Sequence, residues 1–388
     1  MRLSRAPFQP SGRWLAAAGT LLLAGACASA PVKPKSATVF YPAAPELPRI
    51  QYLTSFNGLK DVEEQSRFNR FVVGEKPDLR LDKPYGVAMA DGKLYVCDTN
   101  STVVVFDLKH KLFEPLAGAA SGPGKLLQPV NISIDPKSGI RYVSDPARKQ
   151  VVAYGRDDRY LRAYGEPGEW RPVDAVSYGD RLYVADFSNR VVDVFDLGSG
   201  ERVKQIGNSG DPKDQLVGPT NLAFDASGYL YVTDFGRFQV VVFDRDGHLR
   251  STIGQVGDSV GHFARPKGIA VDRDGRLYAV DAAFDNLQVF NHDGRLLMFF
   301  AGSGEAPGNL TLPAQVAIDY DDLDYFKEYF DPSFKPEYLL LVTSQFGPRL
   351  VNVYAYGKQK GARYPTDDEL LRQMDARRKK DAPAPAGR

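Results

Sequence analysis

The chain has 388 residues, of which 43% are hydrophobic and 25% are charged, a composition that excludes a disordered or fibrous chain. Its 49 basic and 48 acidic residues give a formal net charge of +1, so no concentrated positive field points to a nucleic acid as partner. The length admits one large all-β domain or two smaller domains.

The N-terminus has the features of a secretory signal. Three arginines precede the apolar run LAAAGTLLLAGA, which is too short to remain in a membrane as a helix, and Cys27 follows this run. The stretch LAGAC resembles the signal of bacterial lipoproteins, in which cleavage before the cysteine is followed by its acylation. The resemblance implies a signal peptide at residues 1–26, a lipid on Cys27 and a location in the bacterial cell envelope, with Ala28 favouring the outer membrane. The alternative is an ordinary cleaved signal with an incidental cysteine.

A linker and a second cysteine come next. Residues 27–47 are rich in proline and alanine, which predicts a tether. If Cys27 is acylated, Cys97 is the only thiol left, so the chain can form no internal disulfide. In LYVCD, Cys97 takes the place of small residues in the related segments, which predicts a buried filler.

An internal repeat fills most of the chain. RLYVADFSNRVVDVFD (181–196) recurs as KLYVCDTNSTVVVFD, YLYVTDFGRFQVVVFD and RLYAVDAAFDNLQVFN, and two weaker copies follow the same pattern. Each copy comes after a short strand that opens with proline, and these prolines are about 45 residues apart, the period of a four-stranded propeller blade. The six prolines are Pro84, Pro129, Pro172, Pro219, Pro266 and Pro313. The sequence therefore predicts an all-β fold, a six-bladed β-propeller over residues 48–356.

Each repeat predicts four strands in order. In one unit, the inner strand GIAVD is followed by the tight turn DRDG, then by two further strands and an outer strand such as RLLMFFAG. The unit PKGIAVDRDGRLYAVD, continued by NLQVFNHDGRLLMFFAGSGE, resembles the NHL repeat, and the set resembles an NHL-like six-bladed propeller. Blade six departs from this pattern, because it has an insertion at 320–337 and Ser344 where other repeats have aspartate.

One outer strand is missing after the sixth repeat. The segment PRIQYLTSFNG (48–58) alternates as a strand does and is similar to the outer strand of the other blades. We therefore expect Ile50 to Phe56 to pair with Leu350 to Tyr356. This pairing closes the ring with an N-terminal strand and removes an exposed sheet edge.

A recurrent aspartate ends the second strand of five repeats. A carboxylate at that position can accept backbone N–H groups of the turn that follows. A residue needed in nearly every blade is better explained as a turn residue than as a catalyst. These predicted turn residues are Asp98, Asp145, Asp186, Asp234 and Asp281.

The sequence offers no catalytic residue that we can name. Three of its four histidines are expected in turns at the outer rim, whereas the lyase-type propellers that the fold resembles place several histidines on an axial metal. No serine stands in the setting of a nucleophile with a histidine to serve it.

Polar residues open the inner strands, close to the expected axis. The gluconolactonase-like propellers place Glu, Asn and Asp around a divalent ion, and here Asn131, Asp174 and Asn221 are candidates for a weak site for calcium, another ion or a small ligand. Against an ion stands Lys267, whose ammonium group belongs to the same funnel. The candidate axial residues are Tyr85, Asn131, Asp174, Asn221, Lys267 and Gln315.

Aromatic residues provide candidates for partner binding. In the acidic insertion these are Tyr325, Phe326 and Tyr329; the alternative is a helix packed on the propeller through Leu323, Phe326 and Phe330. A second set follows the turn aspartates and serves either a partner or the packing between repeats. Its members are Phe187, Phe235 and Phe284. The last segment, 357–388, predicts a helix from the cap residue Thr366 and a basic, frayed end.

These observations favour a lipid-anchored envelope propeller, on the periplasmic or surface face, that serves as a protein–protein interaction or scaffold module without catalysis or cofactor. An envelope protein is the expected partner. The alternative is a metal-dependent enzyme of the lactonase or lyase type, or a protein that binds a small ligand at its axis.

Overall fold

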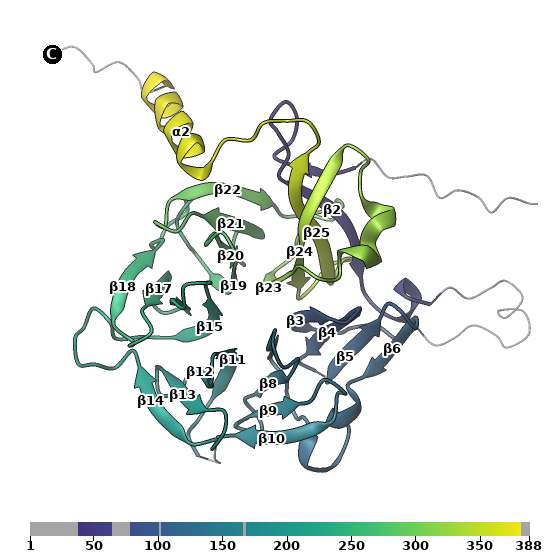
Figure 1. The fold of residues 1–388 in the computed structure, drawn as a ribbon, viewed down its shortest axis with the longest axis vertical. Helices are drawn as coiled ribbons and strands as arrows, with labels where there is room; N and C mark the ends of the chain where they lie inside the picture. The colour runs from purple at the N-terminus through teal and green to yellow at the C-terminus, as the bar shows by residue number, and fades with distance from the viewer. Residues whose placement is uncertain (1–37, 64–77, 101, 166–167, 382–388) are drawn as a thin grey trace, which may run out of the picture. The chain divides into compact units, whose positions relative to one another are not determined.

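The computed structural model describes residues 38–63, 78–100, 102–165 and 168–381. The expected signal peptide at 1–26, Cys27 and the first part of the expected tether lie outside these residues. Within the described ranges the strands form six antiparallel sheets, placed in a ring around a central axis (Figure 1). The predicted six-bladed β-propeller is confirmed.

Blades one to five each consist of four strands that follow one another along the chain. Blade one contains β3 (Pro84–Ala90), β4 (Lys93–Asp98), β5 (Val103–Asp107) and β6 (Leu112–Pro115). Blade two contains β7 (Asn131–Ile134), β8 (Arg141–Asp145), β9 (Gln150–Tyr154) and β10 (Tyr160–Tyr164). Blade three contains β11 (Pro172–Tyr178), β12 (Arg181–Asp186), β13 (Val191–Asp196) and β14 (Arg202–Ile206).

Blades four and five repeat this arrangement, with the proline-led strand innermost. Blade four contains β15 (Pro219–Phe224), β16 (Leu230–Asp234), β17 (Gln239–Phe243) and β18 (Leu249–Ile253). Blade five contains β19 (Pro266–Val271), β20 (Leu277–Asp281), β21 (Asn286–Phe290) and β22 (Leu296–Ala301).

Blade six joins the two ends of the propeller. Its strands are β23 (Pro313–Asp319), β24 (Phe334–Ser344), β25 (Val351–Gln359), β2 (Ile50–Phe56) and β1 (Phe40–Tyr41). β2 pairs with β25 from Ile50 opposite Tyr356 to Phe56 opposite Val351, so the expected closure by an N-terminal strand is confirmed. β1 adds a fifth strand outside β2, which shows that the end of the segment expected to be a tether is part of the sheet.

The hydrophobic core lies between the blades. In blade one, the second strand β4 is apolar on both faces. Leu94 packs in the cluster shared with blade six, whereas Tyr95 packs in the cluster shared with blade two. The other blade contacts have corresponding clusters. Because each sheet buries both faces against its neighbours, a single blade is not stable alone, and the ring has to close.

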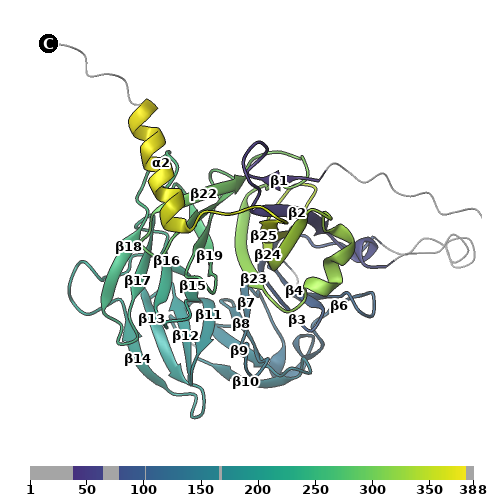
Figure 2. The same cartoon turned by 45° about the horizontal axis from the view of Figure 1, so that its top comes forward.

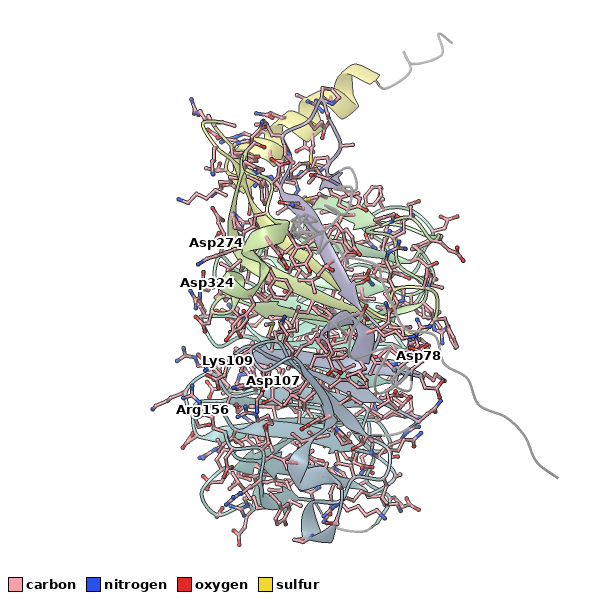
Figure 3. The ribbon with its side chains drawn as sticks, turned by 90° about the vertical axis from the view of Figure 1, so that its right-hand side faces the viewer. Asp78, Asp107, Lys109, Arg156, Asp274 and Asp324 are labelled. Carbon is pink, nitrogen blue, oxygen red and sulfur yellow. The ribbon has the colours of Figure 1, made fainter. Side chains whose placement is uncertain are left out.

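The loops lie on two opposite faces of the ring. One face, which we call the connection face, carries the connections between blades and the turns after each second strand. The other, the hairpin face, carries the turns after the first and third strands. Side chains of the hairpin face, such as Asp107, Arg156 and Asp274, lie toward one side of the molecule in Figure 3, and Asp78 of a connection lies toward the opposite side.

Helices are few in the described ranges. η4 (Leu323–Tyr329) lies in the insertion of blade six, and α2 (Asp367–Asp381) follows the last strand and contacts β22 (Figure 2). The remaining 3-10 turns are η1 (Leu59–Asp61), η2 (Ala117–Ala119) and η3 (Gly122–Gly124). None of the helices seen in this part of the chain has the length and apolar character needed to cross a membrane.

Candidate functional site: the axial funnel

The five repeated aspartates are structural residues of the connection face. Each is at most 2% exposed. The Asp234 carboxylate accepts the N–H groups of Val217 and Gly218 (both 2.9 Å), which precede the inner strand, and those of Gly236 and Arg237 in its own turn (3.1 and 3.2 Å). The other four make the same two kinds of contact. Each carboxylate therefore ties a blade connection to the adjacent turn.

Blade six makes this connection without the aspartate. The Ser344 hydroxyl accepts the N–H of Thr311 at 3.3 Å, and the N–H of Leu312 donates instead to the carboxylate of Asp285 at 2.7 Å. Asp285 belongs to the turn of blade five, so the neighbouring blade supplies the charge that the repeat lacks. The sequence of its own repeat does not reveal Asp285, because the role of this residue depends on a contact between two blades.

Four polar side chains and two glycines form a ring at the axis. They occupy the second position after each starting proline: Gly86, Asn131, Asp174, Asn221, Gly268 and Gln315. The four side chains are between 0% and 6% exposed. Tyr85 and Lys267, which we expected in the same ring, stand one residue earlier and therefore nearer to the connection face. The strand register therefore puts these two side chains outside the ring.

The glycines make room for the amides of neighbouring blades. The Gln315 amide of blade six donates to Asn131 Oδ1 of blade two at 3.3 Å and thus passes blade one. A Cβ on Gly86 would lie 2.4 Å from Asn131 Oδ1, and one on Gly268 would lie 2.0 Å from Gln315 Oε1. The ring therefore requires residues without side chains at these two positions.

Asp174 is the acidic member of the ring. Its two carboxylate oxygens accept the N–H groups of Ala175 and Leu222, both at 2.8 Å. Burial raises the pKa of this carboxyl to about 7, against the lowering effect of these two backbone donors. Next to it in the ring, both amide atoms of Asn221 are buried without a hydrogen-bond partner. A buried amide of this kind is costly unless something satisfies it.

Lys267 lies between the ring and the connection face. Its ammonium group donates to Gln345 Oε1 at 3.1 Å and lies 5.1 Å from the centre of the Tyr85 ring. Burial, and after it the nearby Arg265 and Lys83, lower the pKa of Lys267 to about 8. The positive charge of this ammonium group is therefore only partly compensated by the residues around it.

A cavity of about 800 Å³ opens above the ring on the connection face. Val130, Val173 and Thr220, each one residue before a polar ring residue, contribute to its wall. Its charged residues are the basic Lys83, Lys149 and Arg171 and the acidic Glu169, so positive charge predominates. Tyr85, Trp170, Phe187 and Gln345 also contribute to the lining. We call this cavity the axial funnel.

The aromatics expected to form one partner-binding set have different surroundings. Phe187 lines the funnel, and the guanidinium of Arg171 lies 5.0 Å from the centre of its ring. Phe235 is 38% exposed, whereas Phe284 is half-buried. Phe346 is 52% exposed in the corresponding turn of blade six; we missed it because this copy of the repeat is degraded.

The insertion of blade six packs on the propeller and reinforces the ring closure. Phe326 is 1% exposed and meets Phe56 of β2 with 6.3 Å between ring centres, while Leu323 and Phe330 pack against the same cluster. Phe326 is therefore a core residue, as the alternative of a helix packed on the propeller expected. Tyr325 and Tyr329 remain 37% and 40% exposed.

The metal-ligand chemistry of the described residues is weak. One group of three potential ligands, Asp244, Asp246 and His248, lies in a turn of the hairpin face, where the Asp244 carboxylate accepts the N–H groups of the other two. At the axis, a divalent ion would find a single carboxylate, and both of its oxygens already accept N–H groups. This donor set suits a polar or anionic ligand better than a divalent cation.

Comparisons with known proteins support the fold. No family model matches the chain. A structural genomics protein of unknown function from Bacteroides thetaiotaomicron has 16% identity over 79% of this chain and 75% of its own, with a TM-score of 0.56. A gluconolactonase from Xanthomonas campestris has 17% identity over 84% and 99%, with a TM-score of 0.51. A streptogramin B lyase has 12% identity over 83% and 90%, with a TM-score of 0.50. At these identities the likeness concerns the fold alone.

Proposed function

We propose that this chain is a lipid-anchored, NHL-like propeller of a bacterial cell envelope that binds a small anionic molecule in its axial funnel. The observation that carries the proposal is a cavity of about 800 Å³ whose charged lining consists of three basic residues and one acidic residue. Concave sites with a few converging polar groups are the usual places for ligands.

The chain's own residues account for the binding. Lys83 and Arg171 offer charge-assisted hydrogen bonds to a carboxylate or phosphate at the funnel wall, and Lys267 adds positive charge below them. The rings of Phe187 and Trp170 provide an apolar wall that lowers the local polarity and strengthens these contacts. Next to the lining residue Thr220, the buried amide of Asn221 has donors and an acceptor to spare. These groups bind and orient, and binding is the activity that they support.

The test is calorimetric titration of the purified chain with inorganic phosphate, acetate, succinate and citrate. Arg171→Gln should weaken the tightest of these anions by about tenfold, the loss expected for one charge-assisted hydrogen bond. Arg156→Gln is the matched control, because Arg156 lies on the hairpin face, paired with Asp91. Absence of binding by all four anions, or equal affinities in both variants, contradicts the proposal.

A second function, a protein–protein interaction module, is supported by exposed aromatics on the connection face. Phe235 and Phe346 are 38% and 52% exposed there, and aromatic side chains are frequent anchors of interfaces. Cross-linking in native membranes followed by isolation of the tagged chain tests it. A stoichiometric envelope protein that is lost from Phe235→Ser/Phe346→Ser supports a scaffold role, and an unchanged set of cross-links contradicts docking at this face.

A further inference from the structure

A second cavity, of about 250 Å³, lies on the outer side of blade five, away from the axis. It is bounded by strands β21 and β22, by helix α2 and by the segment before β2. Most of its wall is apolar. The apolar side chains are those of Pro42, Leu47, Val289, Leu297, Met298, Pro365, Leu370 and Met374.

Three arginines line this cavity, and two of them have carboxylate partners. Arg276 contacts Asp272, Asp274 and Asp367 at 3.1, 2.8 and 2.8 Å. Arg377 contacts Glu46 at 3.4 Å. Four carboxylates of the protein itself thus compensate these two guanidinium groups, and the ion pairs also hold α2 against blade five and the N-terminal segment.

Arg49 differs from them. It is only 9% exposed, and its guanidinium donates to the Tyr356 hydroxyl (3.2 Å) and to the carbonyl of Pro365 (3.1 Å). It also lies 5.2 Å from the centre of the Tyr364 ring. None of the ion pairs found among the described residues gives it a carboxylate partner. A buried charge without a counter-ion is costly, so this position favours an anion.

We propose that this cavity binds an anionic amphiphile, with an alkyl chain between α2 and blade five and its carboxylate or phosphate group on Arg49. The apolar wall fits the chain, and the uncompensated guanidinium fits the head group. The volume lies just below the range for drug-sized ligands, which favours one narrow chain over a ring system. A free fatty acid and a phospholipid share this chemistry.

The experiment uses the full chain with Cys27→Ser, so that no acyl group of its own competes. Dodecanoate, dodecanol and lysophosphatidylglycerol are titrated separately, and binding is followed by calorimetry. Dodecanoate should bind at least about tenfold more tightly than dodecanol, because the alcohol lacks the charge that Arg49 meets. Tight binding of dodecanoate alone identifies a fatty acid, and tight binding of lysophosphatidylglycerol as well identifies a broader lipid site.

Four variants make the test specific. Arg49→Gln should remove the preference for the anion, and Met374→Trp, which adds bulk to the α2 side of the cavity, should abolish binding of all three probes. Arg372→Gln is the matched control, because it removes a positive charge from an exposed position of α2 that does not line the cavity. Unchanged dodecanoate affinity in both Arg49→Gln and Met374→Trp overturns the proposal, as does the absence of dodecanoate binding to the parent chain. Arg171→Gln should leave this binding intact, which separates it from the funnel.

Discussion

Gln315 of blade six donates a hydrogen bond to Asn131 of blade two, although blade one lies between them. The contact exists because blade one has Gly86 at this level, where a Cβ would lie 2.4 Å from Asn131 Oδ1. We expect Gly86→Ala to lower the free energy of unfolding by about 1–3 kcal/mol, the usual cost of overpacking. Urea unfolding measures it.

The matched control for this change is Gly302→Ala. No heavy atom lies within 4 Å of a Cβ built on Gly302, and its φ is not in the left-handed region. A similar loss of stability in both variants would show that the close approach of the amides does not matter.

The turn aspartates should behave as structural residues. Asp234→Ala leaves four backbone N–H groups without their acceptor and should cost about 2–4 kcal/mol of unfolding free energy, since each buried unsatisfied donor is expensive. Asp246→Ala, at an exposed turn of the same blade, should stay within about 0.5 kcal/mol of the parent. Thermal unfolding of both distinguishes them, and equal melting temperatures would contradict the structural role.

The buried Asp174 should make stability depend on pH. Its pKa is about 7 in the folded chain, against an ordinary value of 3.8. Between these values the folded state binds a proton that the unfolded state has lost, so stability falls as the pH rises from about 4 to 7. Asp174→Asn removes this dependence, and its stability relative to the parent should increase over the same interval.

Urea unfolding at pH 4.5, 5.5, 6.5 and 7.5 provides the measurement. The informative quantity is the difference between the two chains at each pH, because all other titrating groups cancel. A difference that stays constant would show that the pKa of Asp174 is not raised.

Much of this fold could be predicted because its main features are periodic. The starting prolines recur at blade spacing, and five of the six second strands end in an aspartate that its own turn requires, so local chemistry repeats along the chain. The closing strand could be predicted for a related reason. Six inner strands imply six outer strands, and only five outer strands follow in the repeats. The sixth outer strand is β2, in which Ile50 pairs with Tyr356 of β25.

The site is less predictable, because its contacts join blades that are far apart in sequence. Asp285 replaces the missing carboxylate of blade six from a different blade, and nothing in its own repeat marks it. The axial positions of Tyr85 and Lys267 were also predicted wrongly. In these two blades a glycine holds the ring position, so the polar residue just before it was assigned to the ring instead. The funnel depends on connections of unequal length, which have no period.

The proposed lipid anchor has a direct test. Cys27→Ser should shift the chain from the membrane fraction to the soluble fraction after cell lysis, because the cysteine thiol is where the acyl group would attach. Metabolic labelling with a radioactive fatty acid should mark the parent chain and not the variant. Labelling of both chains, or membrane association of the variant at the parent level, would speak against a lipid on Cys27.

The insertion of blade six should contribute to both stability and partner contact, through different residues. Its core side chain Phe326 packs on Phe56, and the Gln51 side chain donates to the carbonyl of Tyr329 at 2.7 Å, so the insertion holds the closing strand. Phe326→Ala should therefore cost about 3–5 kcal/mol in unfolding free energy. Tyr325→Ser, at an exposed side chain, should leave stability within about 1 kcal/mol.

Tyr325, whose side chain is exposed, is thus the residue to vary when partner binding is measured. A cross-linked partner lost from Tyr325→Ser, at an unchanged melting temperature, would place the contact on this insertion. Loss from Phe326→Ala alone would show instead that a partner needs the closed ring, since that variant loosens the joint between the first and last strands without altering the exposed surface of the insertion.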